Sequence, residues 1–195
     1  MCGIIGIASN KSVTTNIIQS LKKLEYRGYD SAGIATIFNG NIDEKKCTGR
    51  VDNLEKILFK DPSVGILGIG HVRWATHGIP SKVNAHPHSS EEVSVVHNGI
   101  IENHEPLREQ LKTLGYVFNS QTDTEVIAHL IHHERKTKPS LVEAVKAATR
   151  QLELLVTDPR YPRVMQSLDN SPRLMNKVMD LFQRDTFFNR ATGDP

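Results

Sequence analysis

The sequence predicts an α+β fold in which strands and amphipathic helices follow one another within one domain. A glycine-punctuated apolar run opens the chain, and apolar residues recur at helical spacing in residues 13–24. Two runs typical of strands then meet at Asn39-Gly40, a pair that favours a tight hairpin turn. With 195 residues, 38% of them hydrophobic and 24% charged, the chain can bury a core of its own.

The N-terminal part is predicted to alternate between strands and helices. In chain order we expect a buried strand at residues 2–7, a helix at 13–24, a loop at 26–33, strands at 34–38 and 42–47, a helix at 51–59 and a strand at 65–72. The first helix carries Val13, Ile17 and Leu21 on one apolar stripe, with polar residues off it. Asp61-Pro62 ends the second helix.

The later part of the chain is predicted to be largely helical. Thr122 and Glu125 have the spacing of a capping box, which would begin a helix running through His133. A further helix is expected at residues 141–152. In the last stretch, Ser171-Pro172 has the pattern of a helix start, and apolar residues at helical spacing follow it, so we expect a helical tail.

Cys2 combines two groups that could act together in nucleophilic catalysis. Removal of Met1, which is expected when the second residue is small, would leave a thiol and a free α-amine on one residue. A thiolate is a good nucleophile, and an α-amine titrates close enough to neutral pH to act as its general base. The alternative is a small buried residue near the start of the chain, and these residues alone favour that alternative.

Histidines are concentrated between His71 and His97, where five of the nine lie. His86 and His88 are close enough in sequence to raise the question of a metal site. However, no acidic or cysteine residue stands at ligand spacing and no HExxH motif is present, so we expect no metal. Asn98-Gly99 lies between two apolar runs and has the pattern of a hairpin turn with both residues at positive φ.

Composition argues against several classes of partner. A formal net charge of +2 provides no electrostatic basis for binding nucleic acid or a membrane surface. Cys2 and Cys47 are too few for a disulfide framework, and the sequence shows neither a signal-peptide pattern nor an apolar run of transmembrane length. We expect a cytoplasmic protein that uses no cofactor.

Four motifs, in this order along the chain, resemble those of a known enzyme family. They are CGIIG at residues 2–6, LEYRGYDSAG at 24–33, HVRWATHG at 71–78 and VHNGIIEN at 96–103. The similarity continues through residues 115–129, fades near Gln151 and so covers about the first three quarters of the chain. The motifs resemble the glutaminase domain of glucosamine-6-phosphate synthases, which are class II glutamine amidotransferases of the N-terminal-nucleophile hydrolase superfamily.

The resemblance implies a catalytic centre. Cys2 would attack the side-chain amide carbon of L-glutamine, with its own amine acting as the base through a water molecule. Asn98, through its side-chain amide, and Gly99, through its backbone N–H, would form the oxyanion hole of the tetrahedral intermediate. Ammonia would then leave, and water would hydrolyse the thioester.

The same resemblance implies the substrate-binding residues. Arg73 would hold the glutamine α-carboxylate, a role that suits the two-point geometry of a guanidinium. Asp123 would pair with the α-ammonium group, which is compatible with a place at a helix start. Residues lining the pocket are expected at Trp74, Thr76 and His77, and scaffold-supporting histidines at His86 and His97.

The resemblance also implies a fold, a four-layer α/β/β/α sandwich, which we expect to be incomplete here. The glutaminase domain would occupy residues 2–152, and residues 153–195, where the family's glycine-rich strand pair is not found, would form a divergent tail. We also expect the sugar-phosphate isomerase half to be absent. The expected partners are L-glutamine and either a separate sugar-phosphate isomerase or acceptor domain or further copies of the chain in a homo-oligomer.

Three functions remain open on the sequence alone. The first is a glutamine-hydrolysing amidotransferase domain, and the second is a non-catalytic remnant whose exposed sheet edges pair with another protein. The third is a module that binds glutamine without turning it over. A glutamine-dependent ammonia assay separates the first from the others, and glutamine binding by a Cys2→Ala variant separates the third from the second.

Overall fold

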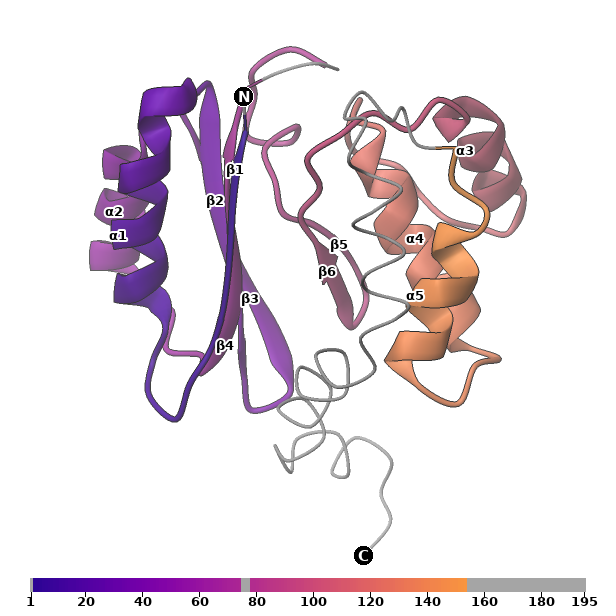
Figure 1. Cartoon of the computed structure of the whole chain (residues 1–195), viewed down its shortest axis with the longest axis horizontal. Coiled ribbons are helices and arrows are strands. Elements are labelled where there is room, and N and C mark those ends of the chain that lie inside the picture. Colours follow the sequence, from indigo (N-terminus) through magenta and orange to yellow (C-terminus); the bar gives the residue numbers. More distant parts are fainter. Residues whose placement is uncertain (1, 75–77, 154–195) are drawn as a thin grey trace, which may run out of the picture. The chain divides into compact units, whose positions relative to one another are not determined.

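Antiparallel pairing organises the part of the chain that the computed structural model describes, residues 2–74 and 78–153. Four strands form one sheet in the order β1-β4-β2-β3, with β1 at Gly3–Ala8, β2 at Ser31–Phe38, β3 at Asn41–Thr48 and β4 at Leu67–Arg73. A two-stranded sheet pairs β5 (His88–Ser90) with β6 (Val93–Val95) (Figure 1). The predicted mixture of helices and antiparallel strands is confirmed.

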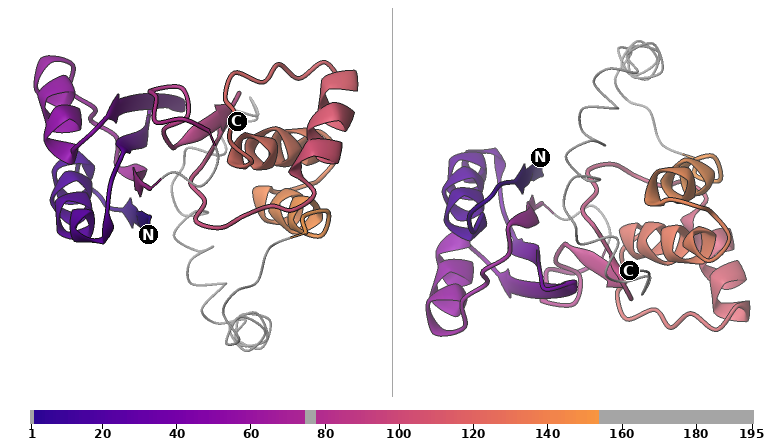
Figure 2. Two further views of the ribbon diagram at one scale, coloured as in Figure 1. Left: turned by 90° about the horizontal axis from the view of Figure 1, so that it is seen from above. Right: turned by 90° about the horizontal axis from the view of Figure 1, so that it is seen from below.

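Helices α1 (Thr14–Leu24) and α2 (Val51–Lys60) cover one face of the four-stranded sheet, as the views of Figure 2 show. A short 3₁₀ turn, η1 (Glu25–Arg27), follows α1. The helix lies close to β4 because Gly68 and Gly70 have no side chains there; a Cβ at Gly70 would lie 2.5 Å from Ile17 Cγ2. Their shared core consists of Val13, Ile17, Ile18, Leu21, Ala32, Ile34, Cys47, Val51, Leu54, Leu58 and Val72.

The second group of elements is built around α4 (Thr124–Arg135). This helix packs on β5 and β6 and is flanked by α3 (His104–Thr113) and α5 (Leu141–Thr149) (Figure 1). Eight consecutive residues of α4, from Thr124 to Ile131, are buried, so the helix is central to this group. Its core consists of Val93, Ile101, Leu107, Leu111, Val126, Ile127, Leu130, Ile131, Ala144 and Ala148.

The two groups meet where the segment before β5 crosses the other face of the four-stranded sheet. Lys46 of β3 donates from Nζ to the Pro87 carbonyl oxygen at 2.9 Å. The imidazole rings of His71, on β4, and His86 have centroids 4.2 Å apart. Gly33 of β2 allows this approach, since a Cβ there would lie 2.1 Å from the His86 carbonyl oxygen. The contact between the groups is therefore close and largely polar.

Most predicted elements of the N-terminal part are present with shifted ends. The helices predicted at residues 13–24 and 51–59 are α1 and α2, and the one predicted at 141–152 is α5, which ends at Thr149. Asn39 and Gly40 join β2 to β3 with φ angles of 51° and 78°. This is the positive-φ hairpin that the dipeptide predicts.

Other expectations need correction. β1 was expected to be buried, but it is an edge strand of the sheet, and Ile4 is 42% exposed. The loop predicted through Gly33 ends earlier, because β2 begins at Ser31 and pairs with both β3 and β4. Helix α3 was not predicted, although Leu107 and Leu111 stand one helical turn apart and both are buried.

Two expectations remain, one on the C-terminal tail and one on membrane-spanning helices. The helical tail predicted from Ser171-Pro172 lies outside the described residues. Within residues 2–74 and 78–153, no helix combines the length and the apolar character needed to cross a bilayer.

The close approach at Gly33 can be tested by adding one methyl group. We expect Gly33→Ala to lower the free energy of unfolding by about 1–3 kcal/mol, because the methyl would displace the His86 backbone. Gly6→Ala is the matched control, since its Cβ would meet nothing nearer than Ile69 Cγ2 at 3.9 Å. Urea denaturation followed by circular dichroism measures both. Equal stability of the two variants would contradict the packing described here.

Candidate active site

The pairing of β1 with β4 brings Cys2 to Trp74. Gly3, the first residue of β1, stands opposite Val72 in the antiparallel register, so Cys2 directly before it reaches the end of β4. The Trp74 backbone N–H donates to Cys2 Sγ at 3.2 Å, and the Cys2 thiol lies 3.4 Å from the Trp74 carbonyl oxygen. Cys2 is half-buried, so this contact holds its sulfur against the main chain at the end of β4.

Asn98 reaches the same point from a distant part of the chain. Its Nδ2 donates to the Cys2 carbonyl oxygen at 3.5 Å, and both Asn98 and Gly99 are exposed. The hairpin predicted at Asn98-Gly99 is wrong, because neither residue has a positive φ and the segment connects β6 to a turn before α3. Long-range contacts hold this backbone instead: His71 Nε2 lies 3.2 Å from the His97 carbonyl oxygen, and the Ile101 N–H donates to Asp123.

Arg73 ends β4 directly before Trp74 and is only 4% exposed. Its Nη1 lies 3.5 Å from Asp30 Oδ1, and its Nη2 donates to the Gly78 carbonyl oxygen at 3.1 Å. The backbone N–H of Asp30 in turn donates to the Arg73 carbonyl oxygen at 2.7 Å. Asp30 therefore orients both the main chain and the side chain of Arg73, a function that sequence reasoning did not assign to it.

Trp74 is 53% exposed, and its indole lies directly on Gly28. Gly28 has a φ of +109°, and a Cβ there would lie 1.8 Å from the indole ring, so no larger residue fits beneath Trp74. The other two predicted pocket residues, Thr76 and His77, lie outside the described part of the chain.

Asp123 is buried and precedes α4 as its N-cap residue. Its Oδ2 accepts the Ile101 N–H at 2.9 Å, and its Oδ1 accepts the Thr124 hydroxyl at 3.3 Å. The carboxylate thereby connects the start of α4 to the segment that carries Asn98. Cys2, Arg73, Asn98 and Asp123 are thus linked through short chains of contacts, although they come from four segments far apart in sequence.

The predicted capping box is wrong in detail. Helix α4 begins at Thr124, and no side chain caps its first N–H groups. Glu125 turns back as such a box requires, but it accepts the N–H groups of Asn119 and Ser120. Burial raises the pKa of Glu125, yet the nearby His129 ring, whose Nε2 lies 3.8 Å from Oε1, and hydrogen bonds from both backbone N–H groups and the Ser120 hydroxyl outweigh burial and lower it to about 2. The Thr122 hydroxyl meets His88 Nε2 at 2.9 Å instead.

Three buried imidazoles, those of His71, His86 and His88, form a histidine stack. The rings of His71 and His86 are 4.2 Å apart, and those of His86 and His88 are 4.8 Å apart. Burial lowers the pKa of His71 to about 4 and that of His88 to about 3, and it holds the pKa of His86 well below its usual value. Sequence reasoning gave His86 a supporting role but missed His71 and His88, although all three lie in the histidine-rich segment.

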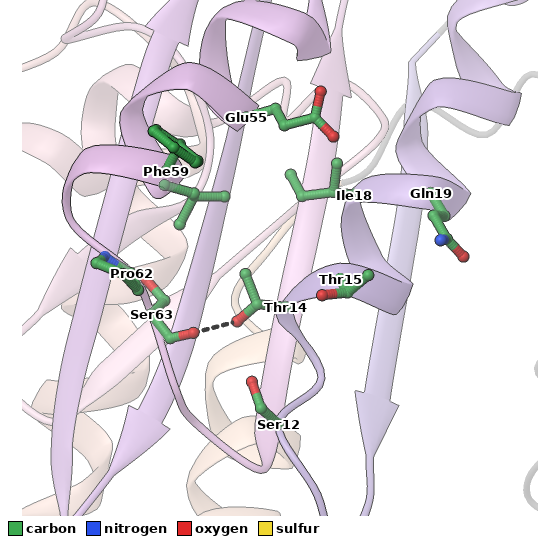
Figure 3. Close-up of a pocket in the computed structure, with 10 residues that line it drawn as sticks. Ser12, Thr14, Thr15, Ile18, Gln19, Glu55, Phe59, Pro62 and Ser63 are labelled. Carbon is green, nitrogen blue, oxygen red and sulfur yellow. Dashed lines mark hydrogen bonds between the residues drawn. The ribbon is translucent and has the colours of Figure 1, made fainter.

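The described residues contain no group of three or more histidine, cysteine, aspartate or glutamate side chains placed to hold a metal ion. A separate cavity of about 290 Å³ opens between α1 and α2 (Figure 3). Its lining includes Phe59, Glu55 and Thr14, whose hydroxyl donates to the Ser63 carbonyl oxygen. None of the predicted catalytic or binding residues lines this cavity.

Comparison with protein families and curated proteins gives a consistent result. Residues 71–149 match the glutamine amidotransferase domain family. The chain is 56% identical over 179 residues to glutamine–fructose-6-phosphate aminotransferase (isomerizing) of Idiomarina loihiensis and 52% identical over 179 residues to that of Pseudomonas putida. Each match covers 88% of this chain but 29% of the relative, so the chain spans less than a third of the length of these curated relatives.

Solved structures agree at the level of the fold. Glutamine phosphoribosylpyrophosphate amidotransferase from B. subtilis superposes with a TM-score of 0.67 at 27% identity, over 79% of this chain and 33% of that one. A structure described as the allosteric regulatory enzyme of purine biosynthesis gives a TM-score of 0.67 at 28% identity, over 79% and 34% of the two chains.

The histidine stack predicts how stability depends on pH. We expect the free energy of unfolding to fall as the pH is lowered from about 6.5 to about 4. In this window folded His71 and His88 stay neutral while the unfolded chain takes up protons, so the unfolded state binds more protons and gains stability. Each histidine contributes up to about 1.4 kcal/mol per pH unit.

Urea denaturation at several pH values between 7 and 4 measures this slope. His88→Gln should flatten it, because the substitution removes one of the protonation sites. His133→Gln, which removes a half-buried histidine of α4, should leave most of the slope in place. A pH-independent stability of the unaltered chain would be inconsistent with neutral buried histidines.

Proposed function

The chain carries a glutamine amidotransferase domain, and on that premise we propose that it hydrolyses the side-chain amide of L-glutamine to glutamate and ammonia through a thioester on Cys2. The observation that carries this proposal is the hydrogen bond from the Trp74 N–H to Cys2 Sγ, with Asn98 beside the same residue. These contacts hold a half-buried thiol at the end of β4, against the residue directly after Arg73 in the chain.

In the proposed mechanism, Met1 is removed and the α-amine of Cys2 becomes the general base. The amine takes the thiol proton through water while sulfur attacks the amide carbon, and the carbonyl π electrons move to oxygen. When the oxyanion collapses, the C–N bond breaks, and the nitrogen receives the proton and leaves as ammonia. Water then attacks the thioester, glutamate is released and the thiol is restored.

We assign the oxyanion hole to Asn98 and Gly99. In this structure the Asn98 amide lies on the Cys2 carbonyl oxygen at 3.5 Å, a long contact that it can exchange for a stronger one to a developing oxyanion. Gly99 lies against the His97 ring, where a Cβ would be 2.8 Å from Nε2. This contact, together with the long-range bonds on either side, supports a fixed direction for the Gly99 N–H.

We assign the two ends of glutamine to Arg73 and Asp123. The Arg73 guanidinium presents paired N–H groups that match a carboxylate, and Asp30 orients it. The buried carboxylate of Asp123 would receive the α-ammonium group. Trp74, together with Thr76 and His77, would cover the pocket and exclude water from the thioester.

We also propose the wider arrangement of the protein. The domain would occupy residues 2–152, with residues 153–195 as a separate tail, and the complete architecture would be a four-layer α/β/β/α sandwich. A supporting observation is that Leu67 and Ile69 alternate with residues facing α1 and remain partly exposed on the opposite face. Ammonia would pass to a sugar-phosphate acceptor domain, as the names of the relatives suggest, and free thiols suit the cytoplasm.

The choice of nucleophile can be tested with the two cysteines of the chain. We expect Cys2→Ala to abolish glutamine-dependent ammonia release, since no other group can form the thioester. Cys47→Ala should keep the activity, because Cys47 is buried in the core beneath α2. A coupled glutamate dehydrogenase assay measures both variants. Loss of activity in both would refute the assignment of Cys2.

Intact mass spectrometry completes this test, since only chains without Met1 should be active. An active chain that keeps Met1 would refute the proposed base. A wild-type chain that binds glutamine without turnover would instead favour a glutamine-sensing module.

The oxyanion hole makes a separate prediction. We expect Asn98→Ala to lower kcat by about 10²–10³-fold, which corresponds to about 3–4 kcal/mol of transition-state stabilisation, with a small change in KM. Asn41→Ala is a control, because Asn41 lies in the distant hairpin at the start of β3. Steady-state kinetics measures both, and a kcat for Asn98→Ala within twofold of wild type would exclude Asn98 from the hole.

A further inference from the structure

We propose that Asn84 is a positioning residue that sets the separation between the two ends of the glutamine pocket, an inference that rests on the function proposed above. The segment 78–84 follows the strand end that carries Arg73, and the segment 119–122 precedes Asp123. These segments are far apart in sequence. The Asn84 side chain joins them.

The contacts of Asn84 use its whole amide group. Nδ2 donates to the Ile79 carbonyl oxygen at 2.9 Å and to Gln121 Oε1 at 3.0 Å. Oδ1 accepts the Gln121 backbone N–H at 2.9 Å. Two donors and one acceptor are thus satisfied by one buried side chain that is 2% exposed. Asn84 and Gln121 thus form a reciprocal hydrogen-bonded pair. Such a pair fixes the distance between the two segments that carry these residues.

Each end of this pair leads, through one or two intervening residues, to a proposed substrate-binding side chain. On one side, the Gly78 carbonyl oxygen accepts the Arg73 Nη2 at 3.1 Å, directly before Ile79 in the chain. On the other side, Gln121 is separated from Asp123 by Thr122, whose hydroxyl is held by His88 and Ser120. The sequence of contacts therefore runs from Arg73 through Gly78, Asn84 and Gln121 to Asp123.

Close packing adds to the hydrogen bonds. Gly78 has a φ of +74°, and a Cβ there would lie 2.7 Å from Asn84 Nδ2 and 3.1 Å from Gln121 Cβ. The Asn84 backbone N–H also donates to Ser81 Oγ at 3.2 Å, which anchors the asparagine within its own turn. The two segments consequently have little freedom to separate or to slide while Asn84 is present.

This arrangement matters for an amino-acid substrate because the α-carboxylate and the α-ammonium group are attached to one carbon. The groups that bind them must keep a fixed separation for both to be engaged together. Asn84 touches neither group nor the reacting atoms. Its effect should therefore appear in recognition of the amino-acid end of the substrate and not in the chemistry at Cys2.

The test uses a graded set of variants in the full chain. Asn84→Ala removes all three side-chain hydrogen bonds, Asn84→Asp keeps the acceptor, and Gln121→Ala removes one bond. We expect KM for glutamine to rise roughly tenfold in Asn84→Ala, at least as much in Asn84→Asp, whose carboxylate oxygen would face the Ile79 carbonyl oxygen, and by a smaller factor in Gln121→Ala, with kcat within about twofold. Asn53→Ala, which removes one hydrogen bond from an α2 side chain to the Thr48 carbonyl oxygen of β3, should leave KM unchanged.

Two further readouts separate positioning from general damage. The rate of Cys2 alkylation by iodoacetamide, measured by mass spectrometry, should be unchanged. The preference for L-glutamate over glutarate, which lacks the α-ammonium group, should fall in Asn84→Ala when both dissociation constants are measured by calorimetry. A parallel fall in kcat, alkylation rate and thermal stability would show a merely structural role and overturn the inference, as would an unchanged KM.

Failure of the proposed function would look different. A wild-type chain that neither hydrolyses glutamine nor binds glutamate would overturn that function and this inference with it. If the wild type is active and the Asn84 variants keep its KM for glutamine, only the inference about Asn84 is overturned. If Asn84→Ala does not fold, Asn84→Asp and Gln121→Ala decide by the same criteria.

Discussion

The antiparallel pairing of β1 with β4 is the constraint on which the candidate site depends. Gly3 stands opposite Val72, and this register alone brings Cys2 to the backbone of Trp74. A slip by one residue would turn the side chains of β1 to the opposite face of the sheet and remove sulfur from the Trp74 N–H. Gly68 and Gly70 stabilise the register indirectly, because they let α1 pack closely on β4.

The contact between the four-stranded sheet and the group of elements around α4 is largely polar, which is unusual for a protein interior. Neutral imidazoles of His71, His86 and His88 occupy a place where aliphatic side chains are the common choice. Such groups are costly to bury without partners, and many of them are paired here: Asp123 with a backbone N–H, Glu125 with two, and His88 with Thr122. Directional bonds of this kind specify one arrangement of the loops that carry the site, whereas apolar contacts tolerate several.

Short sequence patterns correctly predicted the helices and turns that depend only on residues close together in the chain. The stripe of Val13, Ile17 and Leu21 was sufficient for α1, and Asn39-Gly40 was sufficient for the turn between β2 and β3. The same dipeptide at Asn98-Gly99 gave the wrong prediction, because long-range contacts hold that backbone in another conformation. His71 contacts the His97 carbonyl oxygen, and the Ile101 N–H donates to Asp123. Glu125 likewise showed the capping-box spacing, but its burial among Asn119 and Ser120 gave it other donors.

The order of short motifs in the sequence was enough to identify a glutamine amidotransferase domain, because each motif keeps its residue pattern whatever its surroundings. The tertiary structure decides how far apart the motifs lie, and it supplies the residues that maintain those distances. Asp30 beside Arg73, Gly28 under Trp74 and Asn84 between two loops have no local signature. Their partners are far away in sequence, so a hydrogen bond or a close approach becomes visible only when long-range packing has brought the segments together.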